Sequence, residues 1–146
     1  MSENGQGLTR RRFLGGLTVV GLALVPSGLA TLLRSASQDE ASLAAERITQ
    51  LFRDPAEMWP LGRAHLDGRE DRPGERELLA ELLSPDMHPA TVVSSTDSEL
   101  RDALQGWTID DLAAGRIEEV GGWLLGQSEV RLAALVTTMS MPDSRF

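Results

Sequence analysis

The chain contains only two histidines, and neither has neighbours typical of a catalytic base. His65 shares a predicted helical face with Leu61 and Ala64, and Asp67 follows two residues later. His88 falls in a predicted loop. A general base needs a hydrogen-bonding partner and a pocket for its substrate, and the sequence indicates neither. We therefore expect both histidines to be packed or at the surface.

Two pairs of adjacent acidic residues, in a predicted strand and at a predicted helix start, are candidates for catalytic carboxylates. Glu118 and Glu119 lie in a predicted strand, where neighbouring side chains point to opposite faces, so both cannot serve one site. Asp110 and Asp111 fall where a predicted helix would begin, and acids there favour the helix dipole. We predict no catalytic residue. A small self-standing hydrolase that uses carboxylates remains the alternative.

Composition excludes several other kinds of chemistry. All 14 basic residues are arginine, 22 residues are acidic, and cysteine is absent from the 146 residues. Without cysteine there is no thiolate nucleophile, disulfide or iron–sulfur cluster, and without lysine there is no P-loop or Schiff base. The formal net charge of −8 does not suit a nucleic-acid binder. We expect no cofactor, no metal site and no nucleic-acid partner.

The charge is divided unevenly along the chain. Residues 1–37 hold four arginines and one acid, a net charge of +3, which leaves −11 for residues 38–146. The 21 residues from Phe13 to Leu33 carry no charge. A basic patch before an apolar run is typical of a targeting segment, and this run is long enough to cross a bilayer as a helix.

The residues at this basic patch resemble a twin-arginine (Tat) export signal. Thr9, Arg10, Arg11, Phe13 and Leu14 match its pattern of Ser/Thr-Arg-Arg-x-Phe-Leu. The resemblance covers the first quarter of the chain. It implies recognition by the twin-arginine translocation machinery, and export across the cytoplasmic membrane of a domain that folds first. The expected location is therefore the periplasm or cell envelope.

Two fates are open for this signal. Small residues precede Gln38, and cleavage after Ser37 would release a domain of residues 38–146. Retention would instead anchor the domain in the membrane through residues 13–33. We divide the chain into a signal segment, residues 1–37, and a single small helical domain, residues 38–146.

Apolar spacing in the second part predicts short helices. The fold class is mainly α, a small bundle of short helices with a short β-hairpin near residues 116–125. Thr96 and Glu99 form a capping box, Gly106 is expected to end that helix, and Gly115 the next. Residues 85–95 are expected to be an extended connection that places a valine in the core, and Ser128 is expected to cap the last helix.

Two tryptophans are candidate partner-binding residues. Trp107 and Trp123 lie in the region with the most helix and turn signals, residues 106–135, and tryptophan is enriched at protein interfaces. The favoured interpretation is that they fill the core. In size and in carrying a signal the chain is weakly similar to the small subunits of membrane-bound flavin dehydrogenases. That resemblance implies a non-catalytic accessory subunit or binding protein, which carries the export signal for a larger oxidoreductase subunit.

Overall fold

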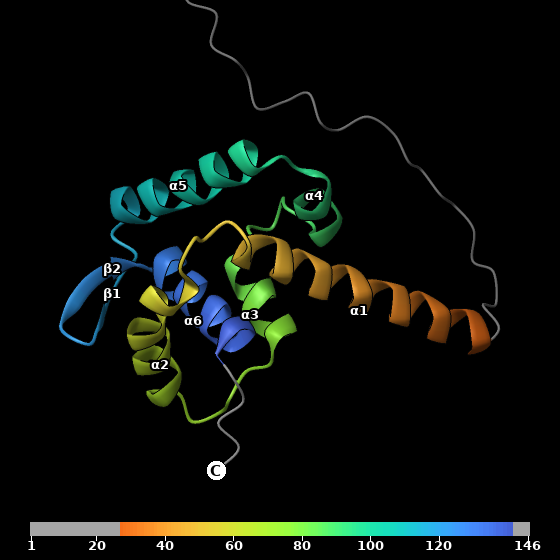
Figure 1. Cartoon of the computed structure of the whole chain (residues 1–146), viewed down its shortest axis with the longest axis horizontal. Coiled ribbons are helices and arrows are strands. Elements are labelled where there is room, and N and C mark those ends of the chain that lie inside the picture. Colours follow the sequence, from red (N-terminus) through yellow and green to blue (C-terminus); the bar gives the residue numbers. More distant parts are fainter. Residues whose placement is uncertain (1–26, 142–146) are drawn as a thin grey trace, which may run out of the picture.

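The computed structural model describes the backbone of residues 27–141 and the side chains of residues 37–141. This part of the chain is mainly helical and contains an antiparallel β-hairpin (Figure 1), so the predicted fold class is confirmed. The elements in chain order are α1 (Ser27–Thr49), the 3₁₀ helix η1 (Pro55–Met58), α2 (Trp59–Asp67), α3 (Glu75–Leu82), α4 (Pro89–Ser94), α5 (Asp97–Ala114), β1 (Ile117–Val120), β2 (Trp123–Gly126) and α6 (Gln127–Ser140).

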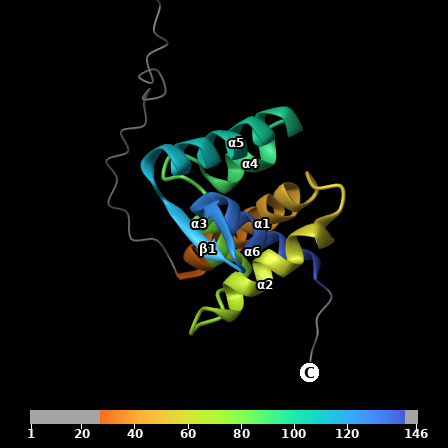
Figure 2. The ribbon, with the colours of Figure 1, turned by 90° about the vertical axis from the view of Figure 1, so that its left-hand side faces the viewer.

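Helix α6 lies at the centre of the fold. Helices α1, α2, α3 and α5 and the 3₁₀ helix η1 all pack against it (Figures 1 and 2). Eight of its 14 residues are buried, which is why its sequence is apolar over most of its circumference. The most deeply buried large side chains come from four helices and are Ile48, Leu78, Leu79, Val92, Val130, Leu135 and Val136.

Helix α1 continues across the predicted boundary between signal segment and domain. It begins at Ser27, and its described side chains, from Ser37 onward, include the core residues Ala41, Ala44, Ala45 and Ile48. The predicted cleavage position after Ser37 therefore falls inside a helix. No helix in residues 27–141 is long and apolar enough to cross a membrane. The targeting residues Thr9, Arg10, Arg11, Phe13 and Leu14 lie outside the described residues.

Several turn and cap predictions are confirmed. Thr96 Oγ1 accepts a hydrogen bond from the Glu99 N–H at 3.3 Å, and Glu99 Oε2 accepts from the Thr96 N–H at 2.8 Å. Gly115 ends α5 with a φ of 69°. The hairpin turns through two further glycines, Gly121 and Gly122, with φ of 60° and 84°. Positive φ at both positions is what a two-residue hairpin turn needs, and glycine adopts it without strain.

Predictions for the middle of α5 are wrong. Gly106 does not end a helix, because α5 continues unbroken from Asp97 to Ala114. A glycine inside a helix costs only about 1 kcal/mol, and neighbouring Leu104 and Trp107 recover more by packing against the core. Asp110 and Asp111 therefore do not begin a helix.

Two other local predictions need correction. Residues 85–95 are not wholly extended, because Pro89 begins the short helix α4, although the expected buried valine is present as Val92. Ser128 does not cap α6. The cap is Gly126, whose N–H donates to Glu129 Oε2 at 2.9 Å. The Ser128 side chain instead bonds a residue of α5.

Helices α2 and α6 approach each other closely at a glycine. Gly62 is buried in α2, and a methyl group at this position would overlap the Thr137 hydroxyl oxygen and the Ala133 carbonyl of α6. Thr137 Oγ1 also donates to the carbonyl oxygen of Met58, which precedes α2. Only glycine allows the two backbones to come this near.

Replacing Gly62 by alanine should therefore force α2 away from α6. We expect Gly62→Ala to lower the free energy of unfolding by about 1–3 kcal/mol, as overpacked cores do. Gly106→Ala is the matched control, because a methyl group there meets nothing within 4 Å and should stabilise α5 by about 0.5–1 kcal/mol. Urea denaturation of both variants measures the effect, and equal behaviour of the two would contradict the close contact.

Candidate functional site

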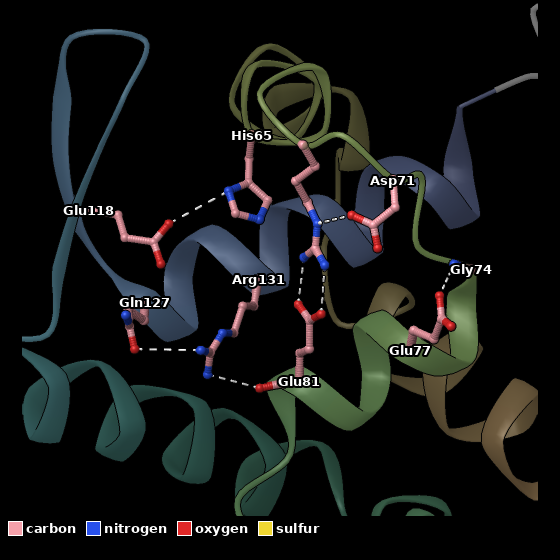
Figure 3. Close-up of polar contacts among 9 residues, drawn as sticks. His65, Asp71, Gly74, Glu77, Glu81, Glu118, Gln127 and Arg131 are labelled. Carbon is pink, nitrogen blue, oxygen red and sulfur yellow. Dashed lines mark hydrogen bonds and ion pairs between the residues drawn. The ribbon is translucent and has the colours of Figure 1, made fainter.

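The first candidate site is built around His65, which has a partner far away in the sequence. Its Nδ1 lies 3.6 Å from Glu118 Oε2 on β1 (Figure 3). The side chain is only 15% exposed, and its Nε2 is buried without a hydrogen-bond partner among the described residues. His65 follows Gly62 by three residues, so both lie on the face of α2 that meets α6. Of the two environments expected for this histidine, packed or at the surface, the structure shows the packed one, and no local sequence pattern indicated its partner.

Charged residues from three more segments surround this pair. Glu81 on α3 accepts two hydrogen bonds from Arg69, at 2.8 and 2.9 Å. The bonds from Arg69 lower the pKa of Glu81 against the opposing effect of burial, and the charges of Arg131 and His65 lower it further. Arg131 on α6 donates to the Glu81 carbonyl at 3.0 Å. Figure 3 shows these side chains converging between α2, α3, α6 and the hairpin.

This polar cluster has the groups of an oriented general base, but the nitrogen that would take the proton is not exposed. A carboxylate beside one histidine nitrogen can hold the ring so that the other nitrogen takes a proton. Here Nε2 is the other nitrogen, and it is buried against protein. An apolar groove of about 350 Å³ between α2, α5 and β2 has a separate lining, which includes Leu61, Leu104 and Leu125 but not His65. The arrangement therefore suits holding elements together better than turning over a substrate.

The remaining acidic and histidine candidates are placed apart from one another. Glu118 points towards His65 while Glu119 is exposed, so adjacent strand residues do lie on opposite faces as predicted. His88 is the residue before α4 and lines a different hollow, beside Met87 and Pro89. In the part of the chain with described side chains, no group of three or more potential ligands could hold a metal ion.

Asp111 fixes the base of the hairpin. Its Oδ2 accepts hydrogen bonds from the Ser128 N–H at 2.6 Å and from the Ser128 hydroxyl, and its Oδ1 accepts from Arg116 Nε at 2.7 Å. Burial opposes the charged form, but the bonds from Ser128 and Arg116 outweigh it and lower the pKa of Asp111. The carboxylate thus joins α5, the hairpin and the first turn of α6, where the helix dipole also favours a negative charge.

The second candidate site is an exposed apolar surface on the hairpin. Trp123 is 70% exposed and Leu124 is 72% exposed, and Ile117 on the paired strand is 46% exposed. By the strand register, Ile117 and Leu124 lie on the outer face of the hairpin, while Trp123, opposite Val120, lies on the other face beside the turn. We call these three exposed residues of the hairpin the hairpin surface. Ile109 and Leu112 on the last turns of α5 are also more than half exposed. Figure 2 shows the hairpin crossing in front of α6, at the outside of the fold.

The two predicted partner-binding tryptophans are thus in different environments. Trp107 is partly buried and packs against the core, as the favoured interpretation expected. Trp123 does not fill the core but stands in solvent at the start of β2, paired with Val120. Leu124 completes the exposed surface and was not predicted from the sequence. Its exposure follows from its place on the outer face of the hairpin, because a sheet of only two strands has no further element to cover that face.

Replacing Asp111 by asparagine tests how the hairpin is held. We expect Asp111→Asn to lower the free energy of unfolding at pH 7 by about 1.5–3 kcal/mol, because hydrogen bonds to a buried charge are lost. Asp110→Asn is the control, since Asp110 is exposed.

A carboxyl group whose pKa is lowered by folding stabilises the folded protein above its unfolded pKa, and this contribution is lost as the pH falls through the folded value. Chemical denaturation from pH 7 to about pH 3 should therefore show the gap between wild type and Asp111→Asn closing below about pH 4. A constant gap would contradict the charged state of Asp111.

Comparisons with known proteins add no relative. No protein-family model matches the chain. No match is found among curated proteins or among solved structures. Two features of the described residues bear on function, the polar cluster around His65 and the exposed hairpin surface.

Proposed function

We propose that the chain is an exported, non-catalytic accessory protein of the cell envelope that binds a larger partner protein through its hairpin surface. The observation that carries the proposal is the exposure of Trp123 and Leu124 on a hairpin whose base is held by Asp111. Large apolar side chains left exposed on both faces of a positioned hairpin are typical of an element that a partner protein covers. Tryptophan contributes strongly to binding because it buries a large area with few rotatable bonds.

Export is proposed from residues 9–14, which match the twin-arginine pattern. The expected partner is a larger oxidoreductase subunit, because cargo of this route folds before export and often carries a redox cofactor. The chain itself has no cysteine and only two histidines, which leaves it few ligands for such a cofactor. The alternative of a carboxylate-dependent hydrolase is less well supported, because Glu118 and Glu119 lie on opposite faces and Asp111 is engaged by Ser128 and Arg116.

Export can be tested with the paired arginines alone. The double variant Arg10→Lys, Arg11→Lys keeps the charge but removes the guanidinium groups that the receptor recognises. We expect this variant to remain in the cytoplasm, while Arg12→Lys, at the free position of the pattern, is exported as the wild type is. Cell fractionation measures both. Continued export of the double variant would contradict the twin-arginine assignment.

Partner binding can be tested by purification from the envelope of the producing organism. We expect the wild-type chain to purify with one larger subunit in constant ratio, and with the absorbance of a flavin or metal cofactor. The variant Trp123→Ser, Leu124→Ser should lose the partner, with a fall in retained subunit of at least tenfold, because interface anchors each contribute about 2 kcal/mol or more.

The matched control is Leu43→Ser, which removes an apolar side chain that is 51% exposed on α1. It should retain the partner. Equal loss in both variants would contradict a specific role of the hairpin surface. Turnover of a substrate by the isolated chain, with activity abolished in His65→Ala, would contradict the accessory function and favour the hydrolase.

A further inference from the structure

The hairpin meets α2 at two neighbouring positions. Its turn lies against Ala64, because a methyl group at Gly121 would come within 3.9 Å of the Ala64 side chain. The next residue of α2, His65, faces Glu118 at 3.6 Å. Two short strands are not stable by themselves in water, so their position depends on such contacts. Of these two, only the contact between His65 and Glu118 depends on charge.

Glu118 has no other ion-pair partner among the described residues. The second nearby carboxylate, Glu81 on α3, is already bound by both terminal nitrogens of Arg69. Arg131 on α6 donates to the Glu81 carbonyl and to Gln127, at 3.0 and 3.5 Å. The charge that holds Glu118 towards α2 is therefore that of His65, when its imidazole is protonated.

The charged groups near His65 on the other elements are Glu81 on α3, Arg131 on α6 and Arg69 after α2. The charged residues of α2 itself are Arg63 and Asp67. The acidic residue of η1, Glu57, lines a separate hollow with Arg53 and Asp54. Nε2 has no hydrogen-bond partner among the described residues, and this leaves Glu118 as the one direct partner of the ring there.

We propose that His65 and Glu118 form a proton-dependent latch that holds the hairpin against α2. In acid the imidazolium attracts the Glu118 carboxylate, and the hairpin is held. Histidine is the side chain whose charge ordinarily changes between pH 5 and 8. When the ring is neutral the attraction is lost, and the hairpin opens more often from α2. The latch is a property of this chain alone, whereas its consequence, control of the hairpin surface by pH, rests on the proposed function.

Hydrogen exchange of backbone amides in the full chain tests the latch without a partner. Protection of amides in residues 117–126 is compared at about pH 5.5 and pH 8, after correction for intrinsic exchange and with α6 amides as reference. We expect wild-type hairpin protection to fall two- to fivefold at the higher pH, the range expected for a partly exposed ion pair. The variant Glu118→Gln should show no such fall.

Glu119→Gln is the control, because it removes a neighbouring charge from the outer face of the same strand. It should behave as the wild type does. Unchanged wild-type protection between the two pH values, or a full pH effect in Glu118→Gln, would overturn the latch. Because the measurement needs no partner, either result would leave the proposed partner binding to be judged by its own experiment.

Discussion

The close packing of α2 against α6 at Gly62 is the contact on which the rest of the arrangement depends. Helix α6 is buried along most of its length, and α2 can lie directly on it only because Gly62 has no side chain. One turn later on the same face, this packing carries His65 into the space between α6 and β1. The hairpin then rests on α2 beside that residue. A single missing methyl group thus determines where the polar cluster forms.

Two carboxylates, one buried and one partly exposed, hold the outer elements to this pair of helices. The buried Asp111 binds the first turn of α6 and Arg116 at the base of the hairpin, and the partly exposed Glu81 binds Arg69 after α2. Removing the partners of Asp111 is costly because its buried charge would stay behind without compensation. The hairpin therefore has a firm base at Asp111, and Glu118 on β1 adds a contact with His65 of α2. Trp123 and Leu124 remain exposed to solvent while the core stays closed.

Local signals in the sequence predicted the secondary-structure elements well, but they did not predict which residues lie next to one another in space. The capping box at Thr96, the stop at Gly115 and the two-glycine turn depend on adjacent residues, so the sequence sufficed for them. Gly106 and Ser128 were misinterpreted because tertiary packing outweighed weak local preferences. The contact of His65 with Glu118 joins residues 53 positions apart, and no local pattern could reveal it.

The same limit applies to the candidate surface. Trp107 and Trp123 have similar local signals, yet Trp107 packs on the core and Trp123 is exposed at the start of β2, because these environments arise only in the assembled fold. Residues 1–26 lie outside the described part of the chain, and the export signal therefore rests on its sequence pattern.

The central claim, that the hairpin surface is where a partner binds, is tested most directly by photo-crosslinking in the producing cell. A photoreactive amino acid is placed at position 123 of the hairpin or at position 43 of α1. The account predicts that position 123 gives one adduct with a single larger protein and that position 43 gives none. Adducts at both positions, or at neither, would contradict it.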